Sequence, residues 1–312
     1  MKQNNNITKA HAAILTANVI FGLGVPLTKY LLTSWVTPMT YMAFRCIGAA
    51  LIFWCIASFL PREHVEKRDL LVIMAGGLLG FVISQTLTAW ALEFTTPVYF
   101  SLIATLTPIA TMLMAALFLG ERITSLKTLG VVLAFAGAAL MVFVGWQSGT
   151  GRNDLLGILL ALLSVLTWVV YLLITRKVSE RYSAVTQMKW IFLVSSIAVV
   201  PFAIGDIQST PLITQAALTS DWLRGALGML FIVGFATVLG YFMIPFAMQY
   251  LRATTVSIYT NLQPVVASLV AIAIGQDLFT WDKPVAAVLV LLSAYIVTQA
   301  TTKAETAGAS KK

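Results

Sequence analysis

Long apolar stretches, separated by short polar breaks, occupy almost the whole chain. Each stretch has about 19–28 residues, which is enough to cross ~30 Å of hydrocarbon as an α-helix. The pattern therefore predicts an all-α integral membrane protein with ten transmembrane helices, at residues 10–31, 38–60, 69–92, 97–119, 126–146, 155–176, 185–205, 223–250, 254–275 and 284–302.

The two halves of the chain share one plan. Residues 91–141 and 247–297 each contain an apolar run, a short polar break and a second apolar run, and Pro108 corresponds to Pro264. Internal repeats of this kind are typical of membrane transporters. Because each half holds an odd number of helices, five, the second half must enter the membrane from the opposite side. We expect two inverted five-helix repeats around a central cavity, divided as an N-terminal tail 1–9, a first repeat 10–146, an outer linker 147–154, a second repeat 155–302 and a C-terminal tail 303–312.

Composition and charge agree with a membrane location. Hydrophobic residues make up 59% of the chain and charged residues 10%, whereas soluble domains are about a quarter charged. In a soluble protein a net charge of +8 would suggest a nucleic-acid partner. Here it follows from the rule that Lys and Arg collect in cytoplasmic loops, since fourteen of them fall on the side shared by both termini and three on the other. We expect both termini in the cytoplasm, a lipid bilayer around the chain and no nucleic-acid partner.

The fourth and fifth predicted helices carry a distinctive motif. Pro108 lies in the middle of the fourth helix, Gly120-Glu121 closes its apolar run, and a Gly/Ala-rich segment runs from Gly130 to Ala138 in the fifth. This pattern resembles the EamA-type permeases of the drug/metabolite transporter superfamily.

The resemblance extends over nearly the whole chain and is weaker in the second half. Phe21-Gly22 and Lys29 in the first helix and Arg45 in the second match the family pattern, whereas Gln276-Asp277 replaces the Gly-Glu pair in the second repeat. The resemblance implies ten helices arranged as a basket, with the fifth and tenth at the periphery. It also implies export of small metabolites, amino acids or related compounds, through what we expect to be a bacterial plasma membrane.

Polar and aromatic side chains within the spans are candidates for the cavity wall. Ser101 and Thr105 share one face of the fourth helix, and Ser257 and Asn261 occupy the corresponding face of the ninth. Such groups either face a cavity or join helices by hydrogen bonds. The candidates for binding a substrate are Asn18, Gln85, Trp90, Tyr99, Ser101, Thr105, Trp168, Tyr171, Tyr241, Ser257, Tyr259 and Asn261.

Prolines and charges near the spans are candidates for hinges and a gate. A proline inside a helix removes a backbone hydrogen bond, which either kinks an inert helix or provides a hinge beside a cavity. We expect Glu93 to pair with Lys29 or Arg45 near an outer gate, unless each of these side chains reaches separately to the headgroups. The candidates for gating are Pro26, Lys29, Arg45, Glu93, Pro108, Pro245 and Pro264.

Three classes of function remain to be compared. An enzyme is not expected, because the chain has no HExxH, P-loop or GxSxG motif, and no metal or cofactor site is indicated. A channel would need a ring of charges or carbonyls, which the sequence does not display. We therefore expect a secondary transporter that moves small organic metabolites by alternating access, with proton coupling and oligomeric state left open. The alternative cargo, a nucleotide sugar or sugar phosphate, would need basic residues in the cavity, and only Lys29, Arg45 and Lys189 could serve.

Overall fold

The computed structural model is helical throughout the part of the chain that it describes, with no strand there. The described residues are 2–94, 103–104, 106–120, 125–145, 154–214, 222–273 and single or paired positions between 281 and 296.

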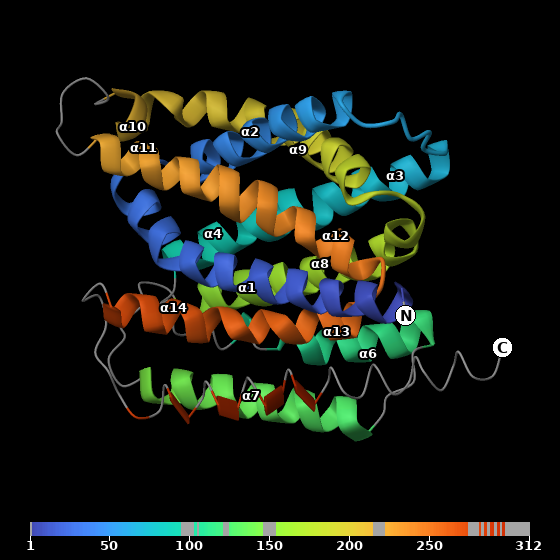
Figure 1. Cartoon of the computed structure of the whole chain (residues 1–312). Helices are drawn as coiled ribbons and strands as arrows, with labels where there is room; N and C mark the ends of the chain where they lie inside the picture. The colour runs from blue at the N-terminus through green and yellow to red at the C-terminus, as the bar shows by residue number, and fades with distance from the viewer. Residues whose placement is uncertain are drawn as a thin grey trace.

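Within the described residues the helices follow the first nine predicted spans (Figure 1), while most of residues 97–106 and most of the predicted tenth span, 284–302, lie outside the described residues. Those of the first half are α1 (Lys2–Ser34), α2 (Pro38–Ser58), α3 (Lys67–Gly76), the π-helix η1 (Gly77–Ile83), α4 (Ser84–Phe94), α6 (Thr107–Leu119) and α7 (Ser125–Gly145). Those of the second half are α8 (Asp154–Arg181), α9 (Ala184–Asp206), the short η3 (Ile207–Ser209), α10 (Pro211–Thr214), α11 (Trp222–Phe231), the π-helix η4 (Ile232–Gly240), α12 (Tyr241–Met248), α13 (Ala253–Ile258), the 3₁₀ turn η5 (Tyr259–Asn261) and α14 (Leu262–Ala273). The predicted fold class is confirmed, and the main differences in the bounds are that α1 begins earlier and α8 ends later than expected.

The outer surface of the bundle is apolar in the middle of the helices. Six helical stretches of the described chain are long and apolar enough to cross a membrane. Large side chains at their centres face outward, for example Leu51, which is 68% exposed, and Ile197, which is 67% exposed. Exposure of this kind on every long helix is stable only against hydrocarbon, so the surface of the bundle is a lipid-facing surface.

The two halves interlock through equivalent contacts (Figure 1). Helix α1 packs on η4 and α12 of the second half, and α8 packs in the same manner on α3, η1 and α4 of the first half. Helix α2 runs along α9. Helix α7 lies at one edge of the bundle, where Ser293 donates a hydrogen bond to the carbonyl of Gly130 at 2.6 Å.

The third helix of each half widens into a π-helix at its centre. These segments are η1, within the continuous helix α3–η1–α4, and η4, within α11–η4–α12. A π-helical turn leaves carbonyl and amide groups offset from the usual ladder and is common at functional sites. The two segments occupy corresponding positions in the repeats, so this widening is a property of the shared plan.

Glycine allows an aromatic ring to lie directly against each π-helical span. A Cβ at Gly80 would overlap the ring of Tyr171 in α8, and a Cβ at Gly240 would lie 2.6 Å from the ring of Phe21 in α1. The absence of a side chain at these glycines therefore sets how closely α8 and α1 approach the opposite half.

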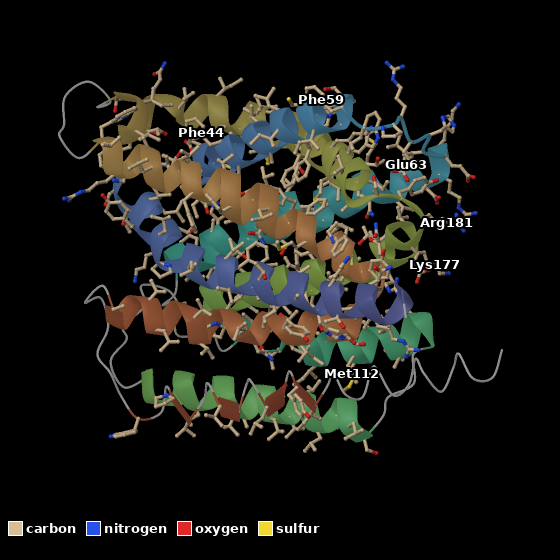
Figure 2. The ribbon with its side chains drawn as sticks, viewed as in Figure 1. Phe44, Phe59, Glu63, Met112, Lys177 and Arg181 are labelled. Atoms are coloured by element: carbon tan, nitrogen blue, oxygen red, sulfur yellow. The ribbon has the colours of Figure 1, made fainter. Side chains whose placement is uncertain are left out.

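Polar contacts tie the helices together at the end of the bundle where α3 begins and α8 ends (Figure 2). Asp69 accepts hydrogen bonds from Arg181 at 3.2 Å and from the hydroxyl of Tyr182 at 3.0 Å. Glu63 accepts a hydrogen bond from the hydroxyl of Ser183, the N-cap residue of α9, at 2.8 Å. These bonds hold the loops between α2 and α3 and between α8 and α9 against each other.

A pair of glycine substitutions tests the close approach of α8 to η1. We expect Gly80→Ala to lower stability by about 1–3 kcal/mol, because the added methyl group overlaps the fixed end of the Tyr171 side chain. Gly234→Ala in η4 is the matched control, since nothing lies within 4 Å of its added Cβ. It should leave stability unchanged or raise it, because alanine favours helix more than glycine does. Thermal unfolding in detergent followed by size-exclusion chromatography measures both, and equal effects would contradict the packing argument.

Candidate functional site

A cavity of about 250 Å³ lies between the two halves, enclosed by α1, α2, α4, α8, α12 and the segment α13–η5–α14. Its wall combines aromatic rings, carboxamides, hydroxyl groups and one guanidinium. The aromatic members are Phe21, Tyr41, Trp168 and Tyr241, the carboxamides are Asn18, Gln85, Asn261 and Gln263, and the guanidinium is that of Arg45. Concave sites with largely apolar walls and a few placed polar groups are typical of small-molecule binding.

Arg45 is the charged group of this wall. It lies about two turns into α2 and is only 6% exposed. Its Nε donates to the hydroxyl of Thr237 in η4 at 2.9 Å, and its Nη1 donates at 3.4 Å to Oε1 of Gln85, which follows η1. Nη1 also lies 3.8 Å from the sulfur of Met42. All of these acceptors are uncharged, and no carboxylate of the described side chains forms an ion pair with Arg45.

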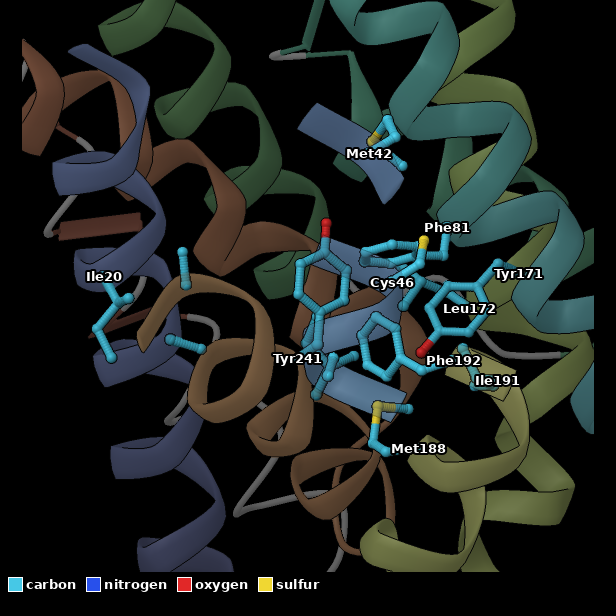
Figure 3. Close-up of a cluster of buried hydrophobic side chains, with 14 of the residues drawn as sticks. Ile20, Met42, Cys46, Phe81, Tyr171, Leu172, Met188, Ile191, Phe192 and Tyr241 are labelled. Carbon is cyan, nitrogen blue, oxygen red and sulfur yellow. The ribbon is translucent and has the colours of Figure 1, made fainter. Parts of the chain in front are cut away.

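Three aromatic rings surround the guanidinium. Its central carbon lies 5.0 Å from the ring centroid of Phe81, 5.3 Å from that of Tyr41 and 5.6 Å from that of Tyr241. Figure 3 shows Tyr241 and Phe81 beside Phe192 within a cluster of buried hydrophobic side chains. The ring faces stabilise the cation by cation–π attraction.

The wall opposite α2 carries carboxamides from α1 and from the segment η5–α14. Gln263 donates a hydrogen bond to Oδ1 of Asn18 at 2.8 Å, and Asn18 donates to the carbonyl of Ile14 at 2.7 Å. Asn261 lines the cavity and is 2% exposed, and its Nδ2 has no hydrogen-bond partner among the described residues. A buried amide donor without a partner is unfavourable. This nitrogen has almost no accessible surface, so a solute in the cavity could accept from it only after the side chain turns.

Hydroxyl groups join α4 to α8 along another side of the cavity. Ser84 donates to the carbonyl of Ser164, and Ser164 donates in return to the carbonyl of Ser84, each at 3.0 Å. The hydroxyls of Thr88 and Ser164 lie 2.7 Å apart. These reciprocal bonds fix the two helices in register and leave the cavity wall fully bonded on this side.

The structure places only part of the predicted substrate-binding set on the cavity wall. The predicted residues that line it are Asn18, Gln85, Trp168, Tyr241 and Asn261. Tyr99, Ser101 and Thr105 lie outside the described residues. Four others point elsewhere, namely Trp90, Tyr171, Ser257 and Tyr259.

Each of those four residues has a contact that explains its position. Trp90 is 39% exposed on the outer surface of α4. Tyr171 lies behind the wall, with its ring centroid 5.0 Å from that of Trp168. Ser257 donates to the carbonyl of Thr254 in its own helix at 2.9 Å. The hydroxyl of Tyr259 lies 2.9 Å from Nδ1 of His11.

The predicted gating residues likewise divide into those that line the cavity and those that do not. Arg45 and Pro264 line the cavity, whereas Lys29 is exposed. Pro26, Pro108 and Pro245 lie within or at the start of α1, α6 and α12 but do not line the cavity. The side chain of Glu93 lies outside the described set, so the expected pairing with Lys29 or Arg45 near an outer gate stays a prediction, and the structure places Arg45 on the wall of the cavity.

Several lining residues were not among the sequence candidates. Phe21 and Tyr41 line the cavity but carry no signal of orientation in the sequence. Thr237, which does not line the cavity and accepts the hydrogen bond of Arg45, lies in an apolar span that gave no reason to single it out. The remaining candidate cation, Lys189, lies away from the cavity, with its Nζ 5.4 Å from the centroid of Trp54 and 5.8 Å from that of Trp190.

Comparisons with known proteins agree with this architecture. The chain is 24% identical over 285 residues to a Bacillus subtilis protein named uncharacterized transporter YyaM, covering 89% of this chain and 90% of that one. An uncharacterized transporter of Archaeoglobus fulgidus is 24% identical, with 91% of this chain and 97% of that protein covered. A WAT1-related protein of Arabidopsis thaliana is 21% identical, with 91% and 82% covered.

The fold and the family are established by two further matches. A solved crystal structure of a protein superposes with a TM-score of 0.72 at 17% sequence identity, covering 96% of this chain and 99% of that one, which establishes the likeness of fold. The sequence profile of the EamA-like transporter family matches residues 8–143 and again residues 155–299. The chain is therefore a multi-pass membrane protein that belongs to the EamA-like transporter family.

Proposed function

We propose that this chain is a secondary transporter that carries small organic solutes, amino acids or related amphipathic compounds, by alternating access through the cavity between its halves. The observation that carries the proposal is the cavity itself, a polar and aromatic site buried within a bundle whose outer surface is apolar. Polar groups buried in a membrane protein either join helices by hydrogen bonds or mark the path of a solute, and a polar cavity between the two halves is where transporters bind their solute.

The interlocked halves supply the element that moves in this proposal. Helices α1 and α8 each cross to the opposite half and line the cavity, so a rocking of one half against the other would open first one side and then the other. We propose the repeats 10–146 and 155–302 as the moving units. The cavity wall contains no Asp, Glu or His among the described residues, so the proposal includes no proton relay.

The orientation and location form part of the same proposal. Arg62 and Lys67 lie just before and at the start of α3, and Lys177 and Arg181 lie in the last turns of α8 (Figure 2). The charge rule assigns this end of the bundle to the cytoplasm. We propose that both termini lie on this side of a bacterial plasma membrane.

Counterflow in proteoliposomes tests the transport activity. Vesicles containing the purified protein are loaded with an unlabelled solute, and uptake of the same solute in labelled form is followed, for amino acids, monocarboxylates, sugars, sugar phosphates and nucleotide sugars in turn. We expect an internal load of an amino acid or related solute to accelerate uptake of the label. A carrier that has released unlabelled solute outside the vesicle binds labelled solute there and carries it inward as its site returns. Equilibration that ignores the internal solute would indicate a channel, and no uptake of any class would contradict a transporter of small organic solutes.

A pair of polar substitutions tests which face of the ninth span contacts the solute. Asn261→Ala should raise the KM about three- to tenfold, because it removes an unpartnered donor from the cavity. The same change should leave thermal stability unchanged or raise it, since no hydrogen bond is lost. Ser257→Ala is the matched control, because its hydroxyl bonds to its own helix. Counterflow rates and thermal unfolding of both variants decide the point, and a loss of stability in Asn261→Ala without a change in KM would assign this residue to packing.

A further inference from the structure

We propose that Arg45 binds a carboxylate of the transported solute, so that the natural cargo is an organic monoanion or zwitterion with a compact apolar or aromatic body. The proposal rests on the transport function proposed above and names its substrate class. It is carried by the contacts of one buried side chain and by the composition of the wall around it.

The surroundings of Arg45 hold its charge without neutralising it. Burying a cation in the membrane is costly, and such residues normally pair with a carboxylate or mark a pathway for a solute. Here the partners are the neutral side chains of Thr237 and Gln85, and no described carboxylate forms an ion pair with the guanidinium. The cavity therefore contains a positive charge that an anion can still neutralise.

The hydrogen bonds of Arg45 differ in strength in a way that suits ligand exchange. The 2.9 Å bond from Nε to Thr237 anchors the side chain to η4. The contacts of Nη1 are long, 3.4 Å to Gln85 and 3.8 Å to the sulfur of Met42, and long contacts of this kind are weak. A carboxylate oxygen can replace them with a short charge-assisted bond while the anchor stays in place.

The number of charges favours a monoanion over a phosphate. Arg45 is the one Lys or Arg on the cavity wall among the described residues, because Lys29 is exposed and Lys189 lies between Trp54 and Trp190. A phosphate monoester carries nearly two negative charges at neutral pH and a nucleotide sugar also carries two, so either would enter the cavity with a charge left over. A carboxylate balances the single guanidinium.

The rest of the wall suits the body of such a solute. The rings of Phe21 and Trp168 supply apolar surface, and Asn261 lies on the wall with an amide donor that a turn of its side chain would bring to the solute. A free ammonium group would meet aromatic faces and amide oxygens instead of a carboxylate. The wall can therefore hold a zwitterion, but the group that it recognises by charge is the carboxylate.

Binding of matched probes to the protein in lipid nanodiscs tests the inference. The probes are phenylacetate, its uncharged amide, phenethylamine and phenyl phosphate, together with isocaproate and its amide as an aliphatic pair. Ligand binding stabilises the folded protein by RT ln(1 + [L]/Kd), so at equal probe concentrations a tighter probe raises the unfolding temperature more, which gives the order of the probes. We expect each carboxylate to bind at least about tenfold more tightly than its amide, because a charge-assisted bond is lost in the amide.

Variants of Arg45 separate recognition of charge from folding. Arg45→Gln should abolish the preference for carboxylate over amide, and Arg45→Lys should retain part of it because the charge remains. Lys189→Gln removes a cation away from the cavity and should behave as the parent protein. If Arg45→Gln fails to fold, the same comparison of probes on Arg45→Lys and the parent still decides the point.

The outcomes distinguish this inference from the proposed transport. Equal binding of carboxylate and amide, tighter binding of phenyl phosphate, or no binding of either carboxylate up to about 10 mM, well above the usual KM range, would overturn the carboxylate site. Counterflow of uncharged or cationic solutes alone would also overturn it, while the transport function stands. Selective binding of carboxylates without any counterflow would support the site and contradict transport.

Discussion

A guanidinium in the middle of a hydrophobic bundle must be supported on all sides, and the interior of this protein is arranged around that requirement. Arg45 is bonded through Nε to Thr237 and faces the rings of Tyr41, Phe81 and Tyr241. These partners come from α2, η1, η4 and α12, so the cation joins helices from both halves. A neutral side chain at this position would leave the hydroxyl of Thr237 without its charged donor and the three aromatic rings without a cation to contact.

The π-helical spans make these contacts possible. Thr237 lies within η4, and Gln85 lies two residues after the end of η1. A π-turn inserts one extra residue into the hydrogen-bond ladder, so the side chains that follow it point in a different direction around the helix axis than they would in a regular α-helix. The same spans approach the opposite half closely at Gly80 and Gly240. Local widening of the third helix in each repeat therefore brings together the polar groups of the cavity and the aromatic packing behind it.

The sequence predicts the helices well because bilayer thickness sets their length, and it predicts the cavity wall poorly because apolar residues cover both the lipid face and the core. Depth along a span can be read from the chain, which is why Asn18 and Asn261 were found. The direction in which a side chain points around the helix axis cannot be read from the chain. For this reason Trp90 and Ser257 were expected in the cavity, although they lie elsewhere. Ser257 satisfies its hydroxyl within its own helix, a solution that no pattern of residues distinguishes from a cavity position. The π-helical segments have no sequence signal of their own, which left Thr237 unnoticed.

The charge of Arg45 breaks the symmetry of the two repeats. Helices α2 and α9 begin at equivalent caps, where Thr37 accepts a hydrogen bond from the amide of Thr40 and Ser183 accepts one from the amide of Thr186. Eight residues beyond the first cap is Arg45, and eight residues beyond the second is Ile191.

Arg45 reaches into η4, and Ile191 packs in the corresponding manner on η1, where a Cβ added at Gly77 would lie 3.1 Å from its Cα. One repeat thus uses this position for charge and the other for packing. Two inverted halves with a cation in each would offer a solute two equivalent orientations. With the only cation of the described cavity wall in one half, the proposed site would hold an acidic solute in a single orientation, with its acid group toward α2 and its body toward α1, α8 and α14. In the proposed site, this departure from symmetry would let a nearly symmetric bundle recognise a polar molecule by one end.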